Sequence, residues 1–223
     1  MKLHFHAHED ADRILDREDY VRELTGALAA INWPHIVTKN AEMDTPRAGA
    51  QTAINLLIHE QLKDLAWTTQ PQLFSAPDKP GWTMDFHKGI VGVEVVFNND
   101  QYMPWALDRL MLARRDATVQ EEHRIRVGVV VVATKKLKKW GKFDDTCATY
   151  EKLRDVWLPH LAPILTFPIW AIGIDAAQGD DEWDPDESPF RGTTKGLRAA
   201  GLAAMEAGEA SDDELDDEPE QED

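Results

Sequence analysis

Cysteine is almost absent from this chain, and so are long apolar runs. Cys147 is the only cysteine among 223 residues, which excludes a disulfide framework and any zinc site of the CxxC type. No signal-peptide pattern opens the chain, and no uninterrupted apolar stretch reaches the roughly 20 residues that a membrane-spanning helix needs. These absences predict a soluble protein of the reducing cytoplasm.

Positive charge is also scarce. The 24 Lys and Arg residues face 41 Asp and Glu residues, and the net charge of −17 would repel nucleic acid. Eleven of the carboxylates lie in residues 206–223, where no Lys or Arg occurs, so the other 205 residues carry only −6. Residues 85–142 hold eleven Lys and Arg against seven Asp and Glu. A basic surface is therefore expected in that middle segment.

The length of the chain suits one domain with appendages. We expect a core at residues 1–175, a C-terminal extension at residues 176–205 and a disordered acidic tail at residues 206–223, because the tail combines high charge with a lack of aromatic residues. A solvating appendage is the preferred interpretation of the tail. A partner-binding segment and a mimic of DNA are the alternatives.

Apolar periodicity divides the core into helices and strands. Helices are predicted at residues 9–31, 45–67, 104–117 and 144–158. Strands are predicted at residues 2–7, 82–86, 90–97, 126–134 and 167–174, and the run of valines in residues 126–134 suits a central strand. The pattern predicts an α/β fold in which a central mixed sheet is flanked by helices.

Two carboxylates stand in the predicted hairpin formed by residues 82–97. A short polar turn would pair its two strands and place Asp85 beside Glu94. Because side chains alternate along a strand, Val95 faces the core and offers only its backbone. Two adjacent carboxylates can form a hard-oxygen site for Mg²⁺. By spacing alone, a solvated hairpin edge explains the two acids as well.

The segment MDFHKGIVGVEVVFNN, residues 84–99, resembles the PD-(D/E)xK nucleases, and among them the type II restriction endonucleases of the BglII and BamHI kind, BglII-like enzymes above all. The opening HEDADRIL, residues 8–15, and the valine-rich strand that ends at Thr134 and Lys135 extend the resemblance over residues 1–175. The hairpin residues that carry it are Asp85, Phe86, Lys88, Val93, Glu94, Val95, Phe97 and Asn99.

This resemblance implies a restriction-endonuclease-like fold and a nuclease core at residues 1–175. It implies that Asp85, Glu94 and the Val95 carbonyl hold Mg²⁺, and that Asn99 joins the two acids in catalysis. It further implies hydrolysis of phosphodiester bonds at a palindromic site in double-stranded DNA, by a homodimer whose two-fold axis matches that of the site.

Val96 departs from the family pattern, because active relatives carry a Lys, Glu or Gln at this third motif position. Valine neither orients nor deprotonates water. Either another side chain does so, or the chain is a DNA-binding module that has lost hydrolysis. The candidates for the missing group are Asn98, Asn99, Lys88, His87 and Glu60, and Glu60 is also a possible auxiliary acid facing the metal.

Contacts to DNA are expected from two places in the sequence. Asn98 and Asn99 close the strand that carries Glu94. The connection between the valine-rich strand and the next helix resembles the recognition loop of the family, and its five lysines suit phosphate contacts. These are Lys135, Lys136, Lys138, Lys139 and Lys142. Arg109, Arg114 and Arg115 either contact phosphate or form ion pairs on the helix surface, and the surface interpretation is preferred.

Two further interpretations of the sequence do not involve a nuclease. His4, His6 and His8 alternate along a predicted strand, and three imidazoles on one face can bind Zn²⁺. The barrel enzymes that begin with such a strand need about 250 residues, so a polar edge strand is the preferred interpretation. An acidic interaction protein with no nucleic-acid partner is the last alternative.

Overall fold

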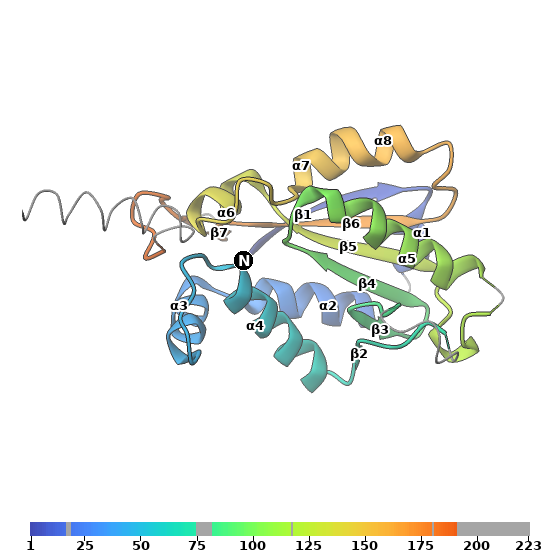
Figure 1. Ribbon diagram of the computed structural model, residues 1–223, viewed down its shortest axis with the longest axis horizontal. Coiled ribbons are helices and arrows are strands. Elements are labelled where there is room, and N and C mark those ends of the chain that lie inside the picture. The colour runs from blue at the N-terminus through green and yellow to red at the C-terminus, as the bar shows by residue number, and fades with distance from the viewer. Residues whose placement is uncertain (17–18, 75–81, 117, 180, 191–223) are drawn as a thin grey trace, which may run out of the picture.

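The computed structural model describes residues 1–16, 19–74, 82–116, 118–179 and 181–190 (Figure 1). The predicted acidic tail and residues 191–205 of the predicted extension lie outside these ranges. Among the described residues, no helix combines the length and the apolar character needed to cross a membrane.

A six-stranded sheet with the order β1-β6-β5-β4-β3-β2 forms the centre of the molecule. Strands β4, β5 and β6 run parallel to one another, and the remaining pairs of neighbouring strands are antiparallel. The strands are β1 (Lys2–His8), β2 (Thr68–Thr69), β3 (Phe86–Lys88), β4 (Val91–Val96), β5 (Val127–Ala133) and β6 (Ile169–Asp175), and a separate pair consists of β7 (Ala177–Gln178) and β8 (Asp181–Glu182). The predicted mixed sheet is confirmed.

Strand β5 explains why its sequence is almost entirely valine. All seven of its residues are buried, because helices cover both faces of the sheet at this strand. Val129 and Val131 pack into one hydrophobic cluster, whereas Val130 and Val132 pack into the other. Continuous apolar sequence is the expected signature of such a strand.

The helices form two layers, one on each face of the sheet (Figure 1). The first layer consists of α1 (Ala11–Leu15), α2 (Asp19–Ala30), α3 (Trp33–Glu42) and α4 (Gln51–Asp64). The second consists of α5 (Met103–Arg115), α7 (Tyr150–Lys152), the π-helical segment η3 (Leu153–Trp157) and α8 (Leu158–Leu161). The short helix α6 (Lys135–Trp140) follows β5, and the 3₁₀ segments are η1 (Asp100–Tyr102) and η2 (Glu121–His123).

Several helix predictions were wrong at their boundaries. The helix expected from residue 45 begins at Gln51, so Pro46 is not in its first turn. The helix expected from Asp144 begins at Tyr150, because Thr149 is its N-cap and accepts a hydrogen bond from the Lys152 N–H. Asp144 instead accepts hydrogen bonds from Thr146 in a tight turn.

Two helices were not predicted. Helix α3 starts after Asn32, whose side chain accepts the His35 N–H, with Pro34 in the first turn, and this is a favourable helix start. Helix α6 occupies the segment expected to be a recognition loop. Its N-cap is Thr134, whose hydroxyl oxygen accepts the Leu137 N–H.

The described part of the predicted extension packs against the main core. Trp183 and Phe190 belong to the same buried cluster as Trp140 of α6, and both rings lie against the Trp140 ring, with centroids 4.7 and 5.5 Å away. These contacts tie residues 181–190 to the end of the sheet where α6 begins.

Candidate active site and DNA-binding cleft

The hairpin of β3 and β4 brings the two predicted acids together. Phe86 pairs with Val93, and continuing that register by one residue puts Asp85 opposite Glu94. The prediction of the first strand was wrong at both ends, because β3 begins at Phe86 rather than at residue 82 and extends two residues further, through Lys88. Gly89 follows it in a left-handed conformation with φ 57°, which glycine adopts at little cost. An Asp85 carboxylate oxygen accepts the Val95 N–H at 2.7 Å.

Glu94 is bound by an arginine from the opposite helix layer. Arg109 of α5 donates from Nε to one carboxylate oxygen at 2.8 Å and from a terminal nitrogen to the other at 2.5 Å. The Glu94 side chain is 1% exposed and that of Arg109 is 28% exposed. The prediction that Arg109 is a surface residue was therefore wrong, because it forms a bidentate ion pair inside the molecule.

The two acids share an electrostatic environment that opposes ionisation. Burial, together with the Asp85 charge, raises the pKa of Glu94 to about 7 against the opposing effect of Arg109. Burial also raises the pKa of Asp85, against the hydrogen bond from Val95 and the charge of Arg109. A cation placed between the two carboxylates would relieve this cost.

Val96 brings no polar atom to the site. Its side chain is 5% exposed and belongs to the cluster that includes Leu107 and Leu110 of α5. Val95 is half-buried and packs against the cluster on the other face of the sheet. The predicted alternation is confirmed, with position 96 on the α5 side and position 95 on the α4 side.

The donor set has the right chemistry for Mg²⁺, because Asp85, Glu94 and the Val95 carbonyl offer oxygen ligands. In the part of the chain that the structure describes, no group of three or more His, Cys, Asp or Glu residues is arranged to hold a metal. Both oxygens of Glu94 are bonded to Arg109. The ligand atoms are therefore of the kind that Mg²⁺ prefers, but Glu94 must release Arg109 before its carboxylate can bind the ion.

A polar cavity of about 250 Å³ opens beside Asp85. Three of the predicted site residues, Asp85, Val95 and Asn98, share its wall. The full lining is Asn55, His59, Gln70, Asp85, Phe86, Val95 and Asn98. Sequence reasoning missed Asn55 and His59, although their spacing of four residues, next to the apolar stripe of α4, places them on one side of that helix.

The other candidates for the missing third group lie elsewhere in the structure. Lys88 forms an ion pair with Glu23 at 2.5 Å, and Glu60 forms one with Lys39 at 3.0 Å. Both contacts take these charges away from the cavity, whose lining includes neither residue.

The side chains of His87 and Asn99 also make their contacts outside the cavity. His87 is 6% exposed and its ring lies against that of His123, with 5.7 Å between centroids. The Asn99 side chain accepts the Gln101 N–H at 3.0 Å and caps η1. Of the five candidates, Asn98 alone lines the cavity beside Asp85.

A wide charged cleft of about 960 Å³ lies next to the end of β4. Asn99 lines it together with four of the five predicted lysines: Lys135, Lys138, Lys139 and Lys142. Lys136 lies outside this lining and forms an ion pair with Glu182 at 2.6 Å. The predicted DNA contacts are thus brought to one surface, except for Lys136 and Asn98.

Acidic side chains share the cleft with the lysines. Asp100 pairs with Lys152, and Asp155 pairs with Arg154. The carboxylates of the lining are Asp100, Asp144, Asp145, Glu151 and Asp155. Acids beside the lysines supply hydrogen-bond acceptors, which base edges require for their amino groups.

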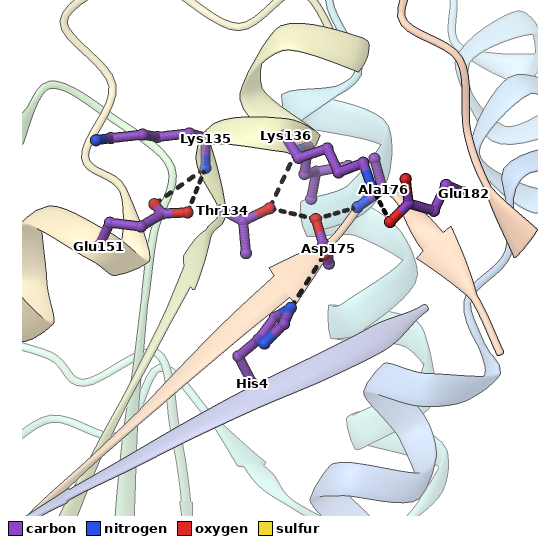
Figure 2. Close-up of polar contacts among 9 residues, drawn as sticks. His4, Thr134, Lys135, Lys136, Glu151, Asp175, Ala176 and Glu182 are labelled. Atoms are coloured by element: carbon purple, nitrogen blue, oxygen red, sulfur yellow. Dashed lines mark hydrogen bonds and ion pairs between the residues drawn. The ribbon is translucent and has the colours of Figure 1, made fainter. Parts of the chain in front are cut away.

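Helix α6 is held at the cleft by a buried polar network (Figure 2). Thr134 donates to one Asp175 oxygen at 2.6 Å, and the His4 ring nitrogen lies 3.0 Å from the other. The Glu151 carboxylate accepts the Lys135 N–H at 3.1 and 3.2 Å. Strands β1 and β6 thereby fix the start of the helix that carries the lysines.

The same network bears on the zinc hypothesis. His4 is bonded to Asp175, and His8 to the Leu165 carbonyl at 2.9 Å. No cluster suited to a metal includes these histidines within the described ranges. The polar contacts of an edge strand account for His4 and His8.

The fold matches that of solved restriction endonucleases. The crystal structure of restriction endonuclease BglII complexed with a DNA 16-mer is similar to this chain with a TM-score of 0.59 and 19% identity, over 78% of each chain. The crystal structure of free BglII is similar with a TM-score of 0.51 and 18% identity, over 78% of this chain and 79% of that one. These likenesses establish the restriction-endonuclease fold.

The family is established by sequence. The family model described as restriction endonuclease BglII/BglIII matches residues 3–174, and the chain belongs to that family. The predicted family, the fold and the enzyme class, a type II site-specific endonuclease, are thereby confirmed. No curated protein matches the chain.

Proposed function

We propose that this chain is a Mg²⁺-dependent type II restriction endonuclease that hydrolyses phosphodiester bonds at a palindromic site in double-stranded DNA. The closeness of Asp85 to Glu94 on one hairpin, where the charge of Asp85 acts on Glu94, inside the segment that matches the family, is the observation that carries the proposal. Cleavage of unmodified plasmid by the purified protein with Mg²⁺ or Mn²⁺ tests it. Discrete fragments are expected, and intact plasmid would reject it.

Asp85, Glu94 and the Val95 carbonyl are the groups proposed to hold the ion. When bound, the ion supplies a Lewis acid that makes water more acidic and neutralises charge on the phosphate. Asp85 already lines the cavity, whereas Glu94 reaches the ion only after Arg109 releases it. Asn99, at the end of the same strand, is proposed to position the DNA backbone from the cleft.

The charged cleft is proposed as the DNA-binding surface. Lys139 is exposed on α6 and lines the cleft, so Lys139→Ala is expected to weaken DNA binding. If it removes one phosphate contact, the slope of log affinity against log salt concentration falls by about 0.9. Fluorescence anisotropy at several salt concentrations measures both quantities.

Lys136→Ala is the matched control for Lys139→Ala. Both residues belong to α6, but Lys136 is paired with Glu182 outside the cleft lining. Its substitution is expected to leave the salt slope unchanged. An equal effect of both substitutions would show that the lysines act only through overall charge.

A homodimer is proposed as the active form, because a palindromic site has two-fold symmetry and each subunit would cut one strand. Sedimentation of the purified protein tests this directly. The single buried cysteine suits the reducing cytoplasm in which such an enzyme would act.

A DNA-binding module without hydrolysis is the second candidate. Two observations favour it: Val96 is buried among apolar side chains, and Glu94 is already neutralised by Arg109. Retention of DNA without cleavage, in both Mg²⁺ and Mn²⁺, would support this candidate over the active nuclease.

A further inference from the structure

The polar cavity beside Asp85 contains one other side chain that can act as a base. Asn55, Gln70 and Asn98 carry amides, which do not act as bases. His59 carries an imidazole, whose neutral form accepts a proton at one ring nitrogen. We propose that His59 takes the proton of the attacking water, the task that Val96 cannot perform.

This inference rests on the proposed nuclease function and assigns its missing catalytic residue. Position 96 faces α5, and its side chain packs among apolar residues there. The cavity opens on the other side of β4, where Val95 and Asp85 form part of its wall. Glu94 faces α5, as position 96 does, so Asp85 and Val95 are the proposed ion ligands that reach this cavity. A water held there by Asp85 meets α4, where His59 is the proton acceptor.

The His59 ring packs beside the residue that follows Asp85 in the chain. The ring lies against Phe86, with 5.8 Å between centroids, and Phe86 directly follows Asp85 in the chain. Asn55, one helical turn earlier, lines the same wall. The imidazole thus has an apolar support on one side and polar neighbours along the cavity.

Gln70 closes the cavity from the strand side. Its backbone is left-handed, with φ 49°, and its N–H donates to the Asp85 carbonyl at 2.9 Å. A left-handed conformation at a residue other than glycine costs free energy, and such residues concentrate at functional sites. The strained residue therefore holds the backbone of Asp85 in place beside His59.

The proposed step balances without any further reactant. The water oxygen forms a bond to phosphorus while one of its protons moves to the neutral ring nitrogen of His59. The bond from phosphorus to the 3′ oxygen breaks, and its electron pair leaves with that oxygen. The 3′ oxygen takes a proton from solvent, giving 3′-hydroxyl and 5′-phosphate ends, and His59 returns its proton to solvent.

Removal of the imidazole tests the assignment. In the full-length protein, His59→Ala is expected to lower the single-turnover cleavage rate by about 10²-fold or more, with DNA affinity unchanged when it is measured without divalent ion. Added imidazole is expected to restore part of the rate, because the vacated cavity gives it access to the water. His59→Gln, which keeps a polar side chain, should show the same loss.

His35→Ala is the matched control, because His35 is an exposed histidine on α3, away from the cavity. The cleavage rate of the His35→Ala protein is expected to equal that of the unmodified protein, and added imidazole should not change it. A fall in the His59→Ala rate without imidazole rescue would assign a structural role to His59 and overturn the inference. Unchanged cleavage by both His59 variants would overturn the role of His59 but not the nuclease function. If the unmodified protein cuts no DNA, the nuclease function and the role of His59 are both rejected.

Discussion

Asp85→Asn is expected to abolish DNA cleavage, with a loss of about 10³-fold or more. The substitution keeps the shape of the side chain and its acceptor for the Val95 N–H, but removes the charge proposed to bind the divalent ion. Losing one group that stabilises charge in a transition state typically costs 10²-fold to 10³-fold, and the loss of an ion ligand adds to this. Single-turnover cleavage of plasmid measures the effect.

The companion measurements separate catalysis from folding and binding. DNA affinity of the Asp85→Asn protein should match or exceed that of the unmodified protein, because the negative charge near the phosphate is gone. Asp64→Asn, an exposed acid at the end of α4, is the control and should cut normally. Undiminished cleavage by Asp85→Asn would contradict the assignment of this acid.

Arg109→Met is expected to destabilise the fold by about 3–5 kcal/mol at pH 8. The Glu94 side chain is 1% exposed, and removing its bidentate partner leaves a buried charge without compensation. Urea unfolding followed by tryptophan fluorescence measures the change. The double variant Arg109→Met with Glu94→Gln should recover most of the lost stability, because it buries an uncharged amide instead.

The pH dependence of this loss follows from the raised pKa of Glu94. With a pKa of about 7 in the folded protein, against an ordinary value of 4.5, the folded state binds more protons between these values. The stability associated with the protonated form is fully present below pH 4.5 and is lost as the pH rises through 7. In Arg109→Met the pKa rises further, so the variant should lose less stability at pH 5 than at pH 8. An equal loss at both pH values would show that the charge of Glu94 is not the cause.

The hairpin and its acids were predictable because their determinants are local. Alternation of apolar residues and the glycine at position 89 define the two strands, and register then places Asp85 opposite Glu94. Strand β5 was predictable for a similar reason, since a run of valines suits burial on both faces. In these places propensity, pattern and tertiary structure agree.

The contacts of Arg109 and His59 depend on packing between elements, which periodicity does not specify. Arg109 reaches Glu94 only because α5 lies against β4, and nothing in the local sequence of α5 indicates a buried partner. His59 borders the buried face of α4, one residue before Glu60. The choice of Glu60 followed from its chemistry as an acid, whereas the structure pairs it with Lys39.

The predicted start of a helix was wrong where the sequence offers two possible N-cap residues. Asp144 and Thr149 are both good N-cap residues, and the later one starts the helix because Asp144 is used in a turn with Thr146. Helix α3 escaped prediction because its apolar face is small, with Ile36 as its one buried residue.

Mapping the ends of the DNA produced by the unmodified protein with Mg²⁺ tests the central claim most directly. We predict cuts at one short palindromic sequence, placed symmetrically on the two strands, with 5′-phosphate and 3′-hydroxyl ends. The same fragments should be missing with Asp85→Asn and when the divalent ion is removed by a chelator. Cuts at unrelated sequences, or fragments that persist in Asp85→Asn, would contradict a site-specific nuclease built on the Asp85 and Glu94 hairpin.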